Sequence, residues 1–261
     1  MKALRNQIVD IWRYRELLHE LFRTWLLLRH TGSILGFLWT LLNPLLLITT
    51  YWVVFSLVLK VGVENFPLLL IPGYLAWNFT FGSVQSGSES IIQNKYLITK
   101  IAFPNEIIVL AKVAVSLVDF LVGLGLYLVA VMIILPVLTA SVLWLPALLV
   151  MHVAFTVGVA LLVACSAVYF KDIPKLVPIL GTMLFFLTPI FYTRDMVPAG
   201  LSAAMWLNPL TWIFSLYHDV LYYHAAPDAG VVAGVAIMSA TALLTGLWLF
   251  NRLKGSFAEL S

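Results

Sequence analysis

Residues 28–57 read LRHTGSILGFLWTLLNPLLLITTYWVVFSL, and this stretch decides the fold class of the chain. After its opening basic residues it stays apolar for about 20 residues, which is long enough for one helical crossing of a bilayer. The Asn43-Pro44 pair interrupts that run, because Pro44 cannot donate a backbone hydrogen bond to the carbonyl of Thr40. A break at membrane depth needs protein or trapped water beside it. We therefore expect residues 40–44 to face a bundle interior, as a packing kink rather than a ligand site.

The composition of the whole chain points to a lipid environment. Hydrophobic residues make up 62% of the 261 residues and charged residues 10%, against about 45–50% and about 25% in soluble domains. A water-soluble fold could not bury that much apolar surface. The single cysteine, Cys165, excludes a disulfide or a thiolate metal site within one chain. The N-terminal residues show no short apolar core with a small-residue cleavage site, so we expect no cleaved signal peptide.

Six apolar segments satisfy or approach the length that a spanning helix needs, about 20 residues. They cover residues 36–59, 68–85, 107–135, 142–170, 176–192 and 231–250. Lysine and arginine concentrate at the N-terminus and after the second, fourth and last segments, and such an excess marks cytoplasmic loops. Six spans place both termini on this basic side, whereas counting residues 201–223 as a seventh would place Arg252 and Lys254 outside.

Residues 201–223 are therefore interpreted as a re-entrant or interfacial helical pair on the outer face. The tetrapeptide Leu-Asn-Pro-Leu, already present in the first span, returns here at residues 207–210. Pro209 removes a backbone donor and biases Asn208 away from the α region, so it divides the segment into two short helices.

The N-terminal residues 1–31 predict a helix of a different kind, lying on the membrane surface. At 100° per residue, one side collects apolar residues and the other collects charged residues and His19. The apolar side holds Leu17, Leu18, Leu21, Phe22, Trp25 and Leu28. A basic polar face opposite Trp and Leu is typical of an interfacial helix on an anionic leaflet. A simple anchor with no further role is an equal alternative.

Four further stretches, together with this helix, carry a resemblance to a known family. They are GSILGFLWTLLNPLL at 32–46, NKYLITKIAFPNEI at 94–107, YFKDIPKLVPIL at 169–180 and WLNPLTWIFSLYHDVLYY at 206–223. In this order they resemble the permease subunit of the type-2 ABC transporters that export lipid-linked polysaccharide, the O-antigen and teichoic acid exporters. The resemblance implies an all-α polytopic membrane protein with one transmembrane domain over residues 1–261. It also implies outer gate helices within residues 194–223, where His218 and Asp219 stand near the position of a frequent family arginine.

The function that this resemblance implies is ATP-driven export of undecaprenyl-linked polysaccharide, O-antigen first, from the cytoplasmic leaflet across a bacterial inner membrane. The implied assembly is a homodimer with two copies of a separate ABC ATPase, and the other expected contacts are the lipid-linked substrate and membrane lipid, not nucleic acid. Export of teichoic acid, or of a small lipid or drug, is the near alternative. A membrane enzyme acting on lipid-linked sugars and a secondary transporter are the alternatives from other classes.

The chain lacks a phosphate-binding loop of the Walker type, since no Gly-Lys dipeptide occurs in it. We therefore expect no catalytic, cofactor or metal site here, and ATP and Mg²⁺ to bind the partner. The cytoplasmic loop at residues 89–106 is the candidate for coupling, with a short helix beginning at Ser88 or Glu89 and ending at Phe103-Pro104. Its candidate contact residues are Tyr96, Leu97, Ile98, Lys100 and Phe103. Residues 169–175 are a smaller second contact.

Polar residues within the spans are candidates by default. Lys112, Ser116 and Asp119 share one face of the third span, and the outer two lie about 10 Å apart along the axis. For Asp119 we favour a helix-joining role over a substrate role. His152, with no second His or carboxylate at metal spacing, is expected to make an interhelical hydrogen bond.

Aromatic and basic residues supply the remaining candidates. Rings that stack on the C–H faces of sugars are expected to line a polysaccharide channel, although membrane-interface belts use the same residue types. The channel candidates are Trp52, Phe55, Tyr74, Trp77, Phe81, Phe191 and Tyr192. Arg23, Arg29 and His30 lie between the surface helix and the first span, where they are expected to capture the phosphate headgroup of a lipid carrier.

Overall fold

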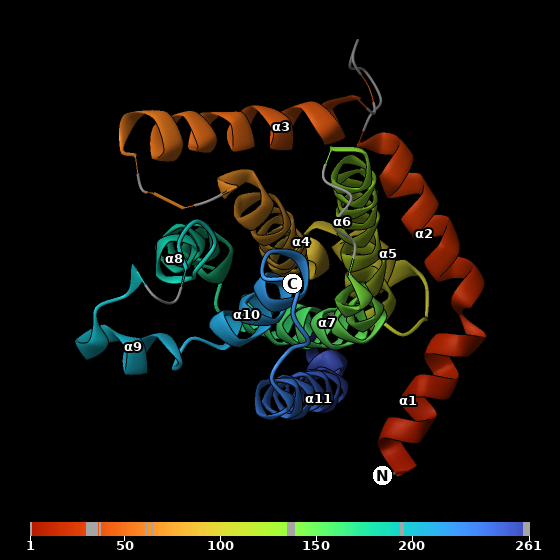
Figure 1. Ribbon diagram of the computed structural model, residues 1–261. Helices are drawn as coiled ribbons and strands as arrows, with labels where there is room; N and C mark the ends of the chain where they lie inside the picture. Colours follow the sequence, from red (N-terminus) through yellow and green to blue (C-terminus); the bar gives the residue numbers. More distant parts are fainter. Residues whose placement is uncertain are drawn as a thin grey trace.

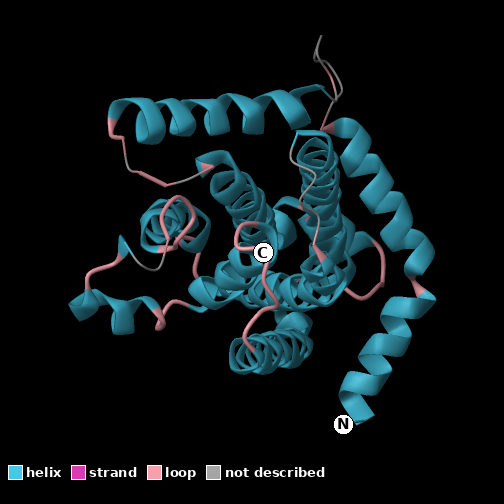
Figure 2. Ribbon diagram, in the orientation of Figure 1, coloured by secondary structure: helices cyan, strands magenta, loops and turns pink. Residues whose placement is uncertain are grey.

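The computed structural model describes residues 2–29, 36, 38–60, 62–63, 65–134, 139–193 and 196–257. Within these residues the regular structure is entirely helical, as predicted, and no strand occurs (Figure 2). The helices are α1 (Lys2–Arg13), α2 (Arg15–Leu28), α3 (Leu38–Trp52), η1 (Val53–Val58), α4 (Phe66–Gln93), α5 (Lys95–Lys100), α6 (Glu106–Ile134), η2 (Ala140–Trp144), α7 (Leu145–Tyr169), α8 (Ile173–Leu187), α9 (Ala199–Met205), α10 (Pro209–Leu221), α11 (Ala229–Leu253) and η4 (Lys254–Ser256).

The core of the bundle is built on the close approach of α7 and α11. A Cβ atom added at Gly158 of α7 would lie 2.3 Å from the carbonyl carbon of Ala242 in α11, and one added at Gly246 would lie 2.5 Å from the carbonyl oxygen of Gly158. Small residues at such crossings let membrane helices gain van der Waals contact where the hydrophobic effect supplies none. The helices α4 and α6 pack on α7 and on each other to complete the core (Figure 1).

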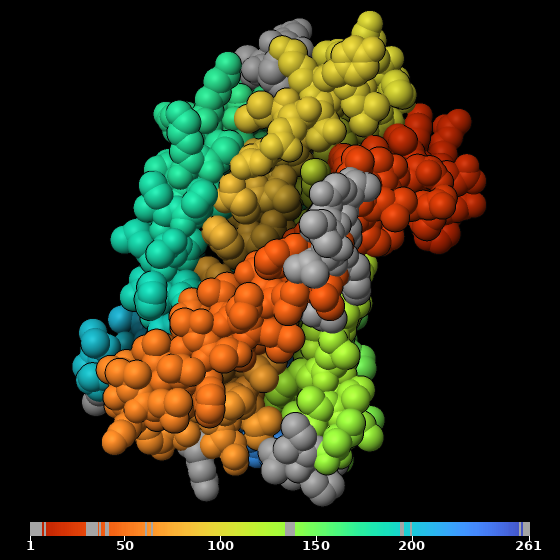
Figure 3. Space-filling view, turned by 90° about the horizontal axis from the view of Figure 1, so that it is seen from above, coloured from red at the N-terminus to blue at the C-terminus, as the bar shows by residue number. Residues whose placement is uncertain are grey.

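A second set of helices wraps this core from outside (Figure 1). The helix α2 runs along the flank of α6 and α1 continues from it towards α11, α3 crosses over α4, and α8 stands beside α4. Figure 3 shows α3 (orange) lying diagonally across one face, with α5 (yellow) towards the top and α9 (blue) low on the other side. The outer sides of α3 and α8 expose large apolar side chains, including Leu46 and Ile179, each 58% exposed.

Membrane-crossing length is clear for three stretches of the described chain. Glu106–Ile133, Ala140–Tyr169 and Ala229–Leu253 are long and apolar enough to span a bilayer, while Leu42–Val58 and Ile173–Leu187 are shorter apolar helices. A helix occupies each of the six ranges predicted to span. The helix α4 is long, but its second half carries several polar side chains. Six crossings therefore stay a prediction.

The predicted N-terminal surface helix is two helices rather than one. The chain leaves the α region at Tyr14 (φ −97°, ψ 22°), which separates α1 from α2. The Tyr14 hydroxyl donates to the carbonyl oxygen of Ala102 at 3.3 Å, so the break lies against the loop that follows α5. No residue of α2 is buried, and Leu27 and Leu28 are exposed.

Several predicted helix boundaries are wrong. One of them is the end of the coupling helix, since α5 ends at Lys100 instead of at Phe103-Pro104, and Ile101 is already extended (φ −127°, ψ 130°). The helix α8 ends at Leu187 instead of reaching residue 192, because Pro189 pushes Thr188 into the extended region (φ −98°, ψ 137°). The predicted helix start at Ser88 lies inside α4, which continues to Gln93. The hydroxyl of Ser88 donates to the carbonyl of Gln85 at 2.7 Å, so it bonds back into the helix rather than capping a new one.

The second Asn-Pro pair begins a helix, as predicted. Asn208 is the N-cap of α10, where its Oδ1 accepts from the backbone N–H of Leu210 at 3.0 Å, and Pro209 occupies the first helical position. The Nδ2 of Asn208 donates to Thr188 Oγ1 at 2.9 Å, which ties α10 to the end of α8. Most of α10 is buried among α4, α7 and α11. The prediction of a re-entrant or interfacial helical pair stays a prediction, since burial within the bundle does not fix the depth of α10 in a bilayer.

His152 makes interhelical hydrogen bonds, which confirms the sequence interpretation. Its Nε2 lies 2.6 Å from Thr80 Oγ1 in α4, and its Nδ1 lies 3.1 Å from the hydroxyl of Tyr217 in α10. Thr80 Oγ1 also lies 3.1 Å from the carbonyl of Ala76. One proton arrangement satisfies all of them: Tyr217 donates to Nδ1, Nε2 donates to Thr80, and Thr80 donates to Ala76.

A buried carboxylate joins distant parts of the chain at one end of the bundle. Glu106, the first residue of α6, is fully buried, and its Oε1 accepts from Gln7 Nε2 at 2.6 Å and from Lys254 Nζ at 3.1 Å. Gln7 also donates to the carbonyl of Leu247 at 3.3 Å. The helix α1, the start of α6 and the end of α11 therefore meet at the same end of the molecule. The segments near both ends of the described chain are therefore held together by this contact.

Candidate translocation and coupling site

An aromatic cluster connects α3, α4 and α8. The ring centroids of neighbouring members lie between 4.9 and 6.1 Å apart, a range in which aromatic pairs attract each other. Its members are Tyr51, Phe55, Phe66, Tyr74, Trp77, Phe81, Phe185, Phe186, Phe191 and Tyr192. Phe185 of α8 is its centre, since its ring contacts Tyr51 of α3 at 5.7 Å and Trp77 of α4 at 5.5 Å.

Glycine makes room for one end of the aromatic cluster. A Cβ atom at Gly181 of α8 would lie 2.0 Å from Cε2 of Phe81, so only a glycine lets that ring lie against α8. Phe81 in turn stacks on Trp77, with an interplanar angle of 11° and 5.7 Å between centroids. The aromatic cluster therefore runs along α4 from Phe81 to Phe66, at the start of that helix.

The structure brings six of the seven predicted channel aromatics together. Trp52 is the exception: it is 39% exposed and belongs to no ring pair of the aromatic cluster. Its neighbour Tyr51 takes that place, because Tyr51 and Phe55 are four residues apart and share a helix face. Sequence reasoning also missed Phe185, for which no local pattern could supply the partner helix.

The predicted coupling loop contains a short exposed helix, α5. The ring of Tyr96 is 76% exposed, and Lys100 Nζ lies 5.6 Å from its centroid. Leu97 and Phe103 are half-buried, and Ile98 packs against the hydrophobic core. Tyr96 and Lys100 are therefore the accessible predicted contacts, whereas Ile98 holds α5 to the bundle.

A second exposed apolar surface lies beside the α7–α8 turn. Phe170 is 68% exposed and Tyr169 39%, and Lys175 pairs with Asp172 at 3.8 Å on the surface. Figure 3 shows the start of α8 and α5 at the same end of the molecule. The two predicted coupling contacts thus face the same side.

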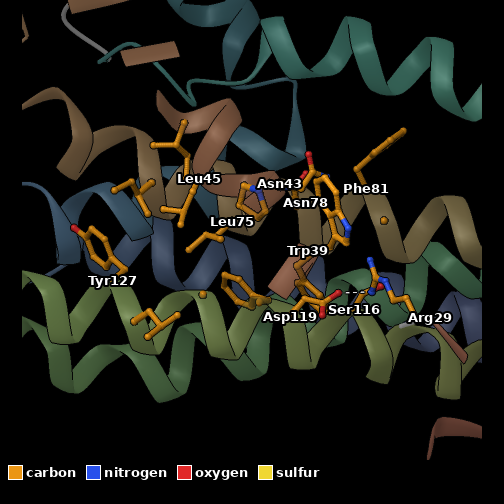
Figure 4. A pocket seen from close by; sticks show the side chains of 18 of the residues that line it. Arg29, Trp39, Asn43, Leu45, Leu75, Asn78, Phe81, Ser116, Asp119 and Tyr127 are labelled. Carbon is orange, nitrogen blue, oxygen red and sulfur yellow. Dashed lines mark hydrogen bonds and ion pairs between the residues drawn. The ribbon is translucent and has the colours of Figure 1, made fainter. Parts of the chain in front are cut away.

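A large cavity separates α3 from α6 on the other side of α4. Its volume is about 880 Å³, which is within the range of sites that hold drug-sized molecules. Asn43 and Pro44 line it, although Asn43 is exposed, and the side chain of Thr40 lies outside the described residues, so the predicted orientation of residues 40–44 towards the bundle interior stays a prediction. Figure 4 shows Arg29, Asp119 and Ser116 at one end and Tyr127 at the other.

The polar residues of the third span all face this side of the bundle. Arg29, just after α2, forms an ion pair with Asp119, and the Nζ of Lys112 lies 4.3 Å from the ring centroid of Trp25 in α2. Ser116 lines the cavity between them. The ion pair is a helix-joining contact of the kind predicted for Asp119. Arg29 is also one of the residues predicted to capture the headgroup, and this ion pair engages its guanidinium.

The other two predicted headgroup residues are not part of this pair. Arg23 is exposed on α2, and His30 lies outside the described residues. Within the described part of the chain, no group of three or more His, Cys, Asp or Glu side chains could hold a metal ion.

A comparison with protein families decides among the classes left open by the sequence. The sequence pattern of the family described as ABC-2 type transporter matches residues 16–222, from α2 to α10. The chain belongs to the ABC-2 type transporter family. It is therefore a multi-pass membrane protein of a transport family. This family membership argues against the alternatives of a membrane enzyme and a secondary transporter.

Individual relatives of this ABC-2 family chain share nearly its full length. It is 31% identical over 252 residues to the O-antigen export system permease protein RfbA of Myxococcus xanthus, covering 96% of this chain and 97% of that protein. It is 29% identical over 235 residues to the protein of the same name from Klebsiella pneumoniae, covering 89% and 90%. The similarity thus extends over the aromatic cluster, α5 and the cavity.

Proposed function

We propose that this chain is the membrane-spanning subunit of an ATP-driven exporter of lipid-linked polysaccharide, with O-antigen as the substrate. The observation that carries the proposal is the similarity, over nearly the whole chain, to proteins named O-antigen export permeases. The aromatic cluster contributes rings of the kind that stack on the C–H faces of sugars, but Tyr74, Trp77 and Phe185 are buried against their neighbours, so stacking on a sugar chain requires the cluster to open during transport.

The proposed working unit is a homodimer with two ABC ATPase subunits, in the bacterial inner membrane with both termini cytoplasmic. One copy cannot enclose a conduit for a hydrated sugar chain, since most rings of the aromatic cluster pack against each other. The exposed apolar sides of α3 and α8 border that cluster and offer a surface for a second copy. ATP and Mg²⁺ bind the ATPase, whose groove receives α5.

Headgroup capture is assigned to Arg23 and Arg29. Each basic side chain near an anionic surface contributes about 1 kcal/mol of attraction. Arg23 is the cleaner test residue, because Arg29→Glu would place a second carboxylate against Asp119 and disturb the fold. Arg23→Glu is expected to lower export while the assembled complex persists; loss of the complex instead would show that the arginine only sets topology.

The deciding experiment is reconstitution of the chain with its ABC ATPase in proteoliposomes. Lipid-linked O-polysaccharide, a lipid-linked teichoic acid precursor and a labelled phospholipid are offered in turn, with and without ATP. We expect ATP-dependent transfer of the O-polysaccharide only. Transfer of the teichoic acid precursor alone, or of the phospholipid alone, would show that this molecule and not O-polysaccharide is the substrate. Chemical change of a lipid-linked sugar without ATP would overturn the transporter function.

A further inference from the structure

The cavity between α3, α4 and α6 has two chemically different ends. Its polar end collects charged and hydrogen-bonding side chains from four segments: Arg29, Asn43, Asn78, Ser116 and Asp119. Its apolar end is lined by Ile48, Ile71, Leu75, Leu126, Tyr127 and Ala130. A site of this kind fits an amphipathic molecule, with a headgroup at one end and hydrocarbon at the other.

The dimensions fit a lipid chain. Ser116 and Ala130 line opposite ends of the cavity on α6, and at 1.5 Å per residue they lie about 21 Å apart along the helix axis. Glycines keep the groove open: a Cβ atom at Gly82 of α4 would meet only Ser116 Oγ, at 3.8 Å. Gly123 lines the floor on α6, where a side chain would press on Leu75. The groove is therefore long, and it is apolar over most of its length.

The polar end favours a phosphate group. The side chain of Arg29 is 51% exposed although Asp119, 22% exposed, pairs with it. Among the described residues the guanidinium makes this one ion pair, and a guanidinium has five N–H donors in a planar fork that suits phosphate oxygens. A phosphate can bind the side of the fork turned away from Asp119, with the guanidinium between the two anions. The side-chain amides of Asn43 and Asn78 line the same end and add neutral donors.

We propose that this cavity binds a phosphate-bearing lipid, with its phosphate on Arg29 and one hydrocarbon chain along α6 towards Tyr127. Such a lipid fills the space between α3 and α6, and its phosphate lies on the side of the Arg29 guanidinium turned away from Asp119. A bilayer phospholipid and the phosphate of a polyprenyl carrier share this chemistry. The site itself does not depend on which substrate is exported.

The test measures lipid that remains bound through purification in a phosphate-free maltoside detergent. Bound phospholipid per chain is counted by native mass spectrometry for the full-length protein, before and after addition of phosphatidylglycerol or phosphatidylethanolamine. Arg29→Gln removes the phosphate contact, and Leu126→Trp fills the apolar end. The matched controls are Arg13→Gln, an exposed arginine at the end of α1 outside the cavity, and Leu121→Trp, which is 44% exposed on α6 against 49% for Leu126 but does not line the cavity.

We expect one retained lipid per chain in the unmodified protein and in both controls. The Arg29→Gln and Leu126→Trp variants are expected to retain about tenfold less lipid. Arg29→Gln loses one charge-assisted contact with the phosphate, and Leu126→Trp takes up the space of the hydrocarbon chain. Equal retention in all five proteins, each monodisperse with an unchanged melting temperature without added lipid, would overturn the proposal. Competition with undecaprenyl phosphate assigns the source: displacement indicates the carrier, and no displacement indicates a bilayer phospholipid. Either source leaves the phosphate-lipid site standing, and export assays with the same variants report on the proposed function separately.

Discussion

At the scale of single residues, the chain uses one tetrapeptide for two purposes. In residues 207–210 the Asn-Pro pair begins a helix, because asparagine caps the free N–H groups and proline tolerates the first helical position. In α3 the same pair lies inside a helix, where Pro44 leaves a carbonyl unbonded and Asn43 faces a cavity instead of capping. The surrounding chain, and not the motif, decides which applies.

The two asparagines therefore predict unequal effects of the same substitution. Asn208→Ala removes the N-cap bond of α10 and the bond to Thr188, and it is expected to lower the free energy of unfolding by about 1–2 kcal/mol. Asn43→Ala, the matched control, is expected to change it by less than about 0.5 kcal/mol, as substitutions away from such contacts usually do. Thermal unfolding of both variants in detergent measures the difference. Equal destabilisation would contradict the assigned roles.

The aromatic cluster gives a second prediction about single residues. Phe185→Leu keeps an apolar side chain but removes the ring that joins α3 to α4, so polysaccharide export is expected to fall severalfold. Phe79→Leu is the control, because Phe79 is also buried, 1% exposed against 7% for Phe185, but stacks on Phe120, outside the aromatic cluster. Each substitution is expected to cost about 1–2 kcal/mol of stability.

Export per folded transporter separates the two variants. A similar fall for both would show that packing, rather than the rings of the aromatic cluster, limits transport.

At the scale of elements, α5 is the accessible part of the predicted coupling loop. Tyr96→Asp places a charge on a ring that is 76% exposed, so the chain is expected to fold and insert but to lose co-purification of its ATPase. Leu207→Asp is the matched control, an apolar residue beside α10 that is 84% exposed. Ile98→Asp is a poorer test, since Ile98 packs against the core. Undiminished recovery of the ATPase with Tyr96→Asp would move the coupling contact elsewhere.

Hydropathy and proline chemistry were enough to predict most helices. The apolar runs locate a helix in each of six ranges, and Pro209 predicts the split between α9 and α10. Boundaries failed where a polar residue had two options: Ser88 could cap a new helix or bond back into α4, and only the continuing helix decides. The bend at Tyr14 likewise depends on its contact with Ala102, 88 residues away.

The candidate site was predictable only along each helix. The positions of Phe55, Tyr74 and Trp77 follow from residue type and spacing, but the choice between Tyr51 and Trp52 depends on which face meets α8. Arg29 and Asp119 are 90 residues apart in the sequence, and they were predicted to have different roles, headgroup capture and helix joining. Periodicity within one helix contains no information about the neighbour that its face will meet.

At the scale of the whole molecule, the exposed sides of α3 and α8 predict where a second copy lies. Cys165 is buried and is the single cysteine of the chain, so Cys165→Ser provides a background for introduced cysteines. Ile179→Cys on α8 is expected to form a disulfide between two copies in oxidised membranes. Ile237→Cys on α11, 69% exposed against 58% for Ile179, is the control and is expected to stay monomeric.

The cross-linked mass on a denaturing gel measures this directly. Cross-linking through Ile237→Cys alone would place the second copy on the opposite side and would separate the aromatic cluster from the dimer interface.

The contact at Glu106 has a consequence for how the chain is made. Gln7 is synthesised first, Glu106 in the middle and Lys254 near the end, yet all three meet around one buried carboxylate. Until Lys254 leaves the ribosome, that carboxylate lacks its cation, and a buried charge without its partner costs about 3–5 kcal/mol. The early helices are therefore held in a weakly closed state during synthesis. In a chain truncated before Lys254, the Glu106 carboxylate would have to take up a proton or stay in contact with water, so the junction of α1 and α6 would not close as it does here.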